Sequence, residues 1–256
     1  MLILALDTTS EGGGAGIYRD HECLAEALHQ GGANYSVTLF EAVERLMAET
    51  RVKPDEIDLY AAAKGPGSFT GIRVGLAATM GWASAYNRPA YGISTLEALV
   101  EMAQPETEQA LGVLDARRGE VFIGRYRRES AQGLIPSPSG SGRPDTLHWA
   151  PEEPDRVLQA SQLAQVLESL PEGGAKVTCI VRELDESVQP FQHMLPPRAA
   201  WKTVPGTLLG AIARLALREN VAPSEMPYHG LDAYYIRRPD AELGQQAGRI
   251  SVQMKP

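Results

Sequence analysis

The chain has 256 residues, which is long for one compact domain and short for two independent ones, so we expect two lobes that share one fold. Its 24 Lys and Arg residues are outnumbered by 32 Asp and Glu residues, and the formal charge of -8 argues against autonomous binding to tRNA or DNA. Cys23 and Cys179 form no CxxC pair, so we expect both to be small, buried apolar side chains in a protein of the reducing cytosol.

The first lobe is predicted to begin with three strands. The run LILALD ends at Asp7, AGIY resumes after a glycine-rich turn, and ECLAEAL ends at Leu28. The apolar run before Asp7 is too short for a signal peptide or a membrane span, so we predict a cytoplasmic protein without membrane contact. Apolar residues then recur at intervals of three and four over 34–49, which predicts an amphipathic helix, and IDLYAAA indicates a buried strand.

Two more helices are predicted in this lobe. The first covers 70–86, with Ser68 or Thr70 as its N-cap and Asn87 at its end. It is apolar nearly all round and rich in small residues, so another helix could lie close to it, either within the lobe or from another subunit. The next helix follows the strand AYGI and opens with STLEALVEMA, in which Ser94 or Thr95 followed by Glu97 is an N-terminal signature. The element order is therefore β-β-β-α-β-α-β-α.

The same order begins again in the second half of the chain. ALGVLD ends at Asp115, the turn ARRG follows, and EVFIGRYRR alternates as a second strand, as LALDTTS and GAGIY do at the start. We therefore expect a first lobe at 1–103 and a second, smaller lobe at 104–204, with the amphipathic helix of 205–220 packing back on the first.

The remaining segments carry weaker patterns. Pro, Gly and Ser dominate 129–155, which indicates an irregular excursion. A helix near 159–170 and the strand KVTCIV follow it. The polar segment 239–256 is expected to be a flexible tail.

Asp7 and Asp115 both stand where a strand ends. In a two-lobed fold such strand ends can face each other across a cleft, where carboxylates could hold a Mg²⁺ ion bound to phosphates. Each Asp could equally cap its own turn by accepting a hydrogen bond from the backbone two residues on. The residues alone leave both interpretations open.

The stretch KGPGSFTGIRVG, residues 64–75, also admits two interpretations. The amides of Gly65, Gly67 and Gly71 could cradle a phosphate at a helix start, or the glycines could let two backbones approach closely. The stretch is not a Walker A loop, because Lys64 precedes the glycines.

Other catalytic chemistry finds little support in the sequence. The five histidines are scattered, and no two of them lie four residues apart on a predicted helix, so we predict no metal site. Ser68 is not in a GxSxG motif and is a better helix cap than nucleophile. The one local basic cluster is either a solvated hairpin or a supporting contact to tRNA, and its members are Arg117, Arg118, Arg125, Arg127 and Arg128.

Together the segments LALDTTS, KGPGSFTGIRVG, GISTLEAL, DARRGEVF and YYIRRP resemble the bacterial TsaB family, also called YeaZ, over residues 1–128 and more weakly over 205–238. The resemblance implies an α/β, actin-like ATPase (ASKHA) fold of two RNase H-like lobes with mixed sheets. It also implies a part in forming threonylcarbamoyladenosine (t6A) just 3′ of the anticodon, in tRNAs that read codons beginning with A.

The resemblance implies a non-catalytic role beside the paralogue TsaD, which transfers the threonylcarbamoyl group with a metal held by two histidines. The matching positions here are Thr95 and Leu99, and neither side chain replaces a histidine ligand. We expect a scaffold that binds TsaD and, with it, TsaE, and that meets tRNA only within the complex. We expect no required cofactor and weak binding of ATP or ADP. The alternatives are an ATP-dependent enzyme that uses the inter-lobe cleft and a metalloprotease, for which ligands are lacking.

The resemblance further implies that the helices of 34–49 and 70–86 pack against the matching pair of TsaD or of a second copy of this chain. The candidate contact residues are Tyr35, Leu39, Val43, Arg73, Leu76, Ala77 and Met80. Tyr35 stands where many relatives have a histidine. We interpret a second set as relics of phosphate-binding loops, and its members are Asp7, Thr8, Gly65, Gly67, Ser68, Asp115 and Gly119.

Overall fold

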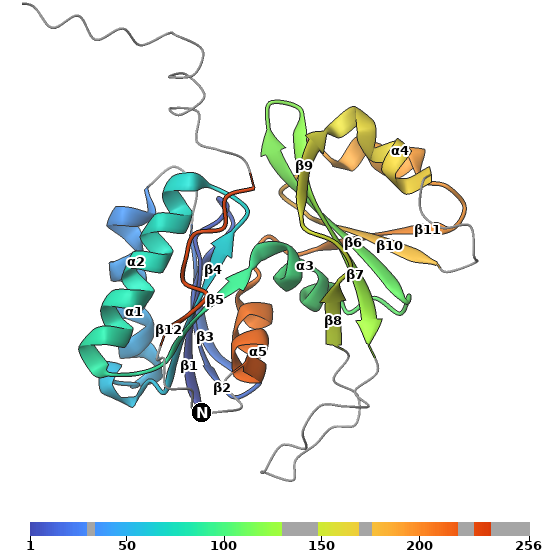
Figure 1. The fold of residues 1–256 in the computed structure, drawn as a ribbon. Coiled ribbons are helices and arrows are strands. Elements are labelled where there is room, and N and C mark those ends of the chain that lie inside the picture. Colours follow the sequence, from blue (N-terminus) through green and yellow to red (C-terminus); the bar gives the residue numbers. More distant parts are fainter. Residues whose placement is uncertain (30–33, 130–147, 169–175, 220–227, 237–256) are drawn as a thin grey trace, which may run out of the picture.

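The chain folds into two lobes, each built on a six-stranded mixed sheet (Figure 1). The computed structural model describes residues 1–29, 34–129, 148–168, 176–219 and 228–236. None of the helices within these ranges is long and apolar enough to cross a membrane.

The first sheet has the strand order β12-β5-β4-β1-β2-β3. Its strands are β1 (Leu2–Asp7), β2 (Gly14–Arg19), β3 (Glu22–Leu28), β4 (Leu59–Gly65), β5 (Ala90–Ser94) and β12 (Tyr228–His229). The pairs β1–β2 and β2–β3 are antiparallel, whereas β1–β4 and β4–β5 are parallel. The short β12 brings the C-terminal part of the described chain back beside β5 in parallel register.

The second sheet has the order β11-β10-β6-β7-β8, with β9 also paired to β7. Its strands are β6 (Gln109–Arg117), β7 (Glu120–Glu129), β8 (His148–Pro151), β9 (Arg156–Gln159), β10 (Val177–Arg182) and β11 (Ala199–Val204). Counted along each lobe, both sheets run 3-2-1-4-5 with the first pairs antiparallel and the last parallel. This repeat confirms the predicted fold class of two RNase H-like lobes with mixed sheets.

The helices separate the molecule into layers (Figure 1). They are α1 (Tyr35–Thr50), α2 (Phe69–Tyr86), α3 (Thr95–Ala103), α4 (Leu163–Glu168) and α5 (Leu209–Glu219). Helices α1 and α2 cover the face of the first sheet that points away from the second lobe, and α3 and α5 lie between the two sheets. Buried Glu101 on α3 joins this helix to α5 through ion pairs to Arg214 and Arg218.

Helix boundaries follow the local signals in the sequence. Ser68 is the N-cap of α2, and its Oγ accepts a hydrogen bond from the Gly71 amide at 3.3 Å. Asn87 ends the same helix in the left-handed conformation. Ser94 caps α3 in the same manner, with its Oγ accepting from the Glu97 amide. Each of these caps is one of the predicted residues.

Several sequence predictions are wrong in detail. The segment 129–155, expected to be irregular, contains β8, and the strand β9 was not predicted. The helix predicted near 159–170 is confirmed within the described residues, as a 3₁₀ turn at Ala160–Gln162 followed by α4. Both strands are four residues long and pair at the edge of a sheet, where partial exposure blurs the alternating pattern. Residues 130–147 of that excursion and the tail of 239–256 lie outside the described residues.

Cys23 also departs from expectation. It is exposed on β3, an edge strand on which only Ala27 is buried. Cys179 is buried on β10 as predicted, and burial raises the pKa of its thiol to about 12.

Candidate functional site

The outer side of α1 and α2 carries an exposed apolar surface. Val37 is 64% exposed, Phe40 is 53% exposed and Met80 is 47% exposed. The Phe40 ring meets the Trp82 ring edge-on, with 5.3 Å between centroids, so the two helices present one continuous surface. Large apolar side chains gathered on neighbouring helices mark a protein-binding surface more often than a solvated one. We call the exposed residues Val37, Phe40, Ala77 and Met80 the outer face.

The structure divides the predicted contact residues into two groups. Arg73, Ala77 and Met80 are exposed on α2, as a contact role requires. The prediction is wrong for Leu39, Val43 and Leu76 as contact residues, because all three are at least 95% buried in the core beneath the helices. These residues belong to the stripe of each helix that faces the first sheet.

Sequence reasoning missed Val37 and Phe40 as members of the outer face. Both were counted within the apolar periodicity of the first helix, although they lie off the stripe formed by Leu39, Val43 and Leu46. The signal that could have found them is that Leu39, Val43 and Leu46 already form a full buried stripe, so that further large apolar residues on the same helix must lie outside it.

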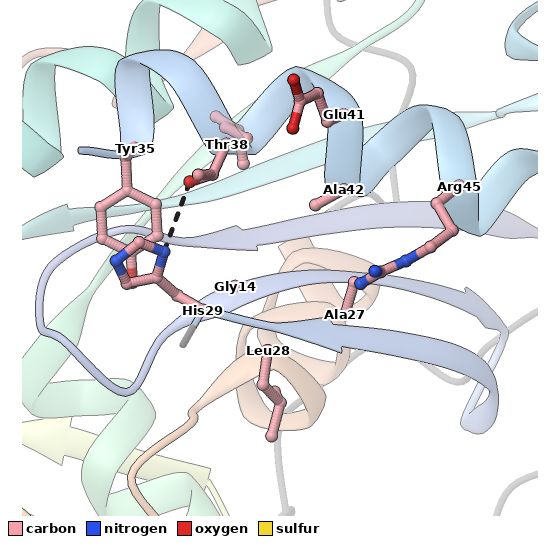
Figure 2. A pocket seen from close by; sticks show the side chains of 10 residues that line it. Gly14, Ala27, Leu28, His29, Tyr35, Thr38, Glu41, Ala42 and Arg45 are labelled. Carbon is pink, nitrogen blue, oxygen red and sulfur yellow. Dashed lines mark hydrogen bonds between the residues drawn. The ribbon is translucent and has the colours of Figure 1, made fainter. Parts of the chain in front are cut away.

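Tyr35 begins α1 and borders a pocket between that helix and β3 (Figure 2). Its ring stacks on His29 at 4.2 Å between centroids, and its hydroxyl donates a hydrogen bond to the Ser10 carbonyl at 2.6 Å. Burial raises the pKa of this hydroxyl, so it stays a donor at neutral pH. Tyr35 therefore fixes the start of α1 to the loop after β1.

The rest of the pocket is polar along one side of α1. Thr38 Oγ1 lies 3.4 Å from His29 Nδ1, and Glu41 and Arg45 follow on the same side of the helix (Figure 2). The cavity measures about 360 Å³ and is lined by side chains of both charges.

The glycines of residues 64–75 serve close approach of two backbones. A Cβ at Gly71 would overlap the Thr8 carbonyl oxygen, and a Cβ at Gly75 would overlap Thr8 Oγ1. Thr8 Oγ1 donates to the Gly71 carbonyl at 2.7 Å, and the Ser68 amide donates to the Thr9 carbonyl at 2.8 Å. The start of α2 thus packs directly on the loop after β1, which the sequence left as one of two interpretations.

Asp7 and Asp115 each cap their own turn. Asp7 Oδ1 accepts from the Thr9 amide at 3.1 Å, and Asp115 Oδ1 accepts from the Arg117 amide at 2.7 Å. The two turns end β1 and β6, the first strand of each lobe, as the repeat predicts. Gly119 completes the second turn with a positive φ of 75°.

Asp7 is also paired with a residue of the other lobe. Arg182, the last residue of β10, is 1% exposed, and its Nη2 lies 3.5 Å from Oδ2 of the fully buried Asp7. The guanidinium further donates to Ser10 Oγ at 2.5 Å and to Thr9 Oγ1 at 3.2 Å. Sequence reasoning did not find Arg182, because nothing in the run KVTCIVRE distinguishes it from a surface arginine.

The basic cluster on the β6–β7 hairpin is largely paired. Arg125 and Arg127 lie on one side of β7, as alternation predicts, and both contact Glu152. Arg128 donates to the Glu106 carbonyl, and Arg117 lies 3.4 Å from Glu11. These partners reduce the positive field that a phosphate backbone would meet.

Asp155 forms a second contact between the lobes, with Tyr234 and Lys64. Burial raises its pKa to about 6, while the Tyr234 hydrogen bond and the Lys64 charge oppose that shift. Because the folded pKa exceeds the unfolded value, the folded state binds more protons between about pH 4 and pH 6, and stability falls as pH rises through that window.

We expect Asp155→Asn to remove this contribution. The difference in urea midpoint between the variant and the unmodified chain should grow from pH 4 to pH 6.5 in favour of the variant. Measuring both proteins at each pH cancels the titration of other groups. An unchanging difference would contradict a raised pKa at Asp155.

Thr95 and Leu99, which the resemblance described above places at the metal-ligand positions of TsaD, are fully buried on α3. Leu99 packs in the apolar core between the sheets. Within the described residues, no group of three or more His, Cys, Asp or Glu side chains is placed to hold a metal ion.

Comparison with known proteins shows what the chain is similar to. Residues 29–135 match the family model described as "TsaD: tRNA N6-adenosine threonylcarbamoyltransferase". The tRNA threonylcarbamoyladenosine biosynthesis protein TsaB of Bacillus subtilis is 34% identical over 137 residues, which cover 53% of this chain and 58% of that protein. The alignment thus spans little more than half the length of that relative. The Escherichia coli TsaB is 24% identical over 89% of this chain and 99% of its own length.

A solved structure of YeaZ from Pseudomonas aeruginosa superposes with a TM-score of 0.61 at 21% sequence identity, covering 88% of this chain and 99% of that one. The shared fold extends over both lobes. The chain is therefore similar in sequence to the TsaB proteins and shares the fold of YeaZ, and its residues 29–135 are similar to the TsaD family model.

Proposed function

We propose that this chain is a non-catalytic scaffold subunit in t6A formation, and that it binds TsaD through the outer face of α1 and α2. The observation that carries the proposal is the exposure of Val37, Phe40 and Met80 together on two adjacent helices. The TsaB names of its relatives support a place in t6A biosynthesis. Binding of TsaE is proposed to follow from the assembly with TsaD.

The chemistry of the chain supports a role without catalysis. Asp7 and Asp115 use their oxygens to hold turns, and Leu99 offers no lone pair to a metal. Pairing of Arg125 and Arg127 with Glu152 supports contact with tRNA only within the complex. A homodimer through the same face is the competing assembly, because an exposed apolar surface could bind either TsaD or a second copy of this chain.

Reconstitution tests the proposal. Purified TsaD and TsaE from the same organism, with tRNA and the threonylcarbamoyl donor, are assayed for t6A by mass spectrometry with and without this chain. We expect product only when the chain is present, a stable complex with TsaD in size-exclusion chromatography, and neither ATP turnover nor t6A from the chain alone. Full t6A formation without it, or ATP turnover by it alone, would contradict the scaffold role.

A further inference from the structure

The junction of the two lobes, where β1 and β10 end, does not fit the Mg-nucleotide that an actin-like fold implies. Such a site needs carboxylate oxygens open to a metal or its water shell. Asp7 is 0% exposed, and both of its oxygens are engaged. Oδ1 accepts from the Thr9 amide and from Thr9 Oγ1 at 2.6 Å, and Oδ2 accepts from the Leu208 amide at 3.3 Å with Arg182 Nη2 beside it.

The positive charge at this place comes from the chain itself. Arg182 reaches from the end of β10 in the second sheet to the loop after β1 in the first. Its charge also acts on Asp185, whose pKa is raised by burial and lowered by the guanidinium. One buried cation therefore pairs with a carboxylate of the first lobe and lowers the pKa of a carboxylate of the second.

We propose that Arg182 is a built-in cation that occupies the junction of the lobes in place of a nucleotide-bound metal, excluding Mg-ATP from this junction and holding the two lobes in one arrangement. Its fork of donors suits this role, because one guanidinium contacts Asp7, Thr9 and Ser10 together. In an actin-like enzyme the lobes can open when a ligand leaves the cleft, whereas a covalently attached cation cannot leave.

The same contact reaches the start of α1. Ser10 accepts a hydrogen bond from Arg182 at its side chain and one from the Tyr35 hydroxyl at its carbonyl. One residue of the loop after β1 therefore contacts both the arginine of the second lobe and the first residue of α1. The contact between the lobes therefore also helps to hold α1, which carries part of the outer face, in position.

Arg182→Ala tests the proposal, with Arg214→Ala as the matched control. Both variants remove an arginine from a buried carboxylate, but Glu101 keeps Arg218 in the control whereas Asp7 loses its only cation among the described residues. We expect a larger fall in thermal midpoint for Arg182→Ala, and partial recovery of that midpoint with millimolar guanidinium ion in this variant alone. Equal midpoints for the two variants, or no recovery, would overturn the role of the cation.

Two further measurements keep the test decisive if Arg182→Ala does not fold. The double variant Asp7→Asn with Arg182→Met removes both charges, and the proposal requires it to be more stable than Arg182→Met alone. Calorimetry of the unmodified chain with Mg-ATP should give no binding heat at millimolar nucleotide. Micromolar binding of Mg-ATP, or a double variant no more stable than the single one, would refute the proposal.

Discussion

Replacing Met80 with Asp is expected to weaken binding to TsaD by about a hundredfold and to abolish t6A formation in the reconstituted mixture. Met80 is 47% exposed, so the new carboxylate is hydrated in the free chain and the fold is retained. In the complex it would be buried against an apolar surface without a counter-charge. A hundredfold loss corresponds to about 2.8 kcal/mol, less than the cost of burying an unpaired charge. Calorimetric titration with TsaD measures the affinity, and circular dichroism checks the fold.

The matched control places the same charge elsewhere. Leu184 is 53% exposed in the second lobe, and Leu184→Asp should leave the affinity for TsaD within about twofold. Ala77→Glu, one turn before Met80 on the exposed side of α2, should act as Met80→Asp does. If Met80→Asp and Leu184→Asp bind TsaD equally well, the outer face is not the binding surface. If a homodimer uses that face, sedimentation will show that Met80→Asp is monomeric.

Local signals explain what the sequence predicted well. Ser68, Asn87 and Ser94 end or begin helices by contacts within a few residues, and Asp7 and Asp115 hold their turns across two. Each of these contacts depends on residue type and spacing alone. The repeated strand order could be predicted for the same reason, because it was read from short apolar runs and the turns between them.

Long-range contacts explain what the sequence did not predict. Arg182 lies 173 positions after Thr9, and Asp7 is two residues before Thr9. Only the packing of one sheet beside the other brings Arg182 to these residues. The division of α1 into Leu39 on the core side and Phe40 on the outer face depends on where the first sheet lies. A helix that is apolar on two sides does not reveal which side is the core.

Gly71→Ala is expected to lower the free energy of unfolding by about 2 kcal/mol or more. The new Cβ would overlap the backbone carbonyl of Thr8, and neither the loop nor α2 can move without straining the Thr8–Gly71 and Ser68–Thr9 hydrogen bonds. Helix propensity acts in the opposite direction, since Ala is favoured over Gly by about 1 kcal/mol in a helix interior. A net loss would therefore show that close approach dominates at this position. Urea unfolding of the isolated chain measures it.

Gly81→Ala is the control within the same helix. Its Cβ would meet no atom of the described residues within 4 Å, so only helix propensity acts and stability should rise by about 0.5 to 1 kcal/mol. The two substitutions are chemically identical, and their opposite signs would assign the glycines of α2 to two different roles. Gly71 lets the loop after β1 pack against the helix, whereas Gly81 leaves the exposed side of the helix next to Met80 without a side chain. If both substitutions stabilise the chain, the packing of α2 on Thr8 is looser than the close approach requires.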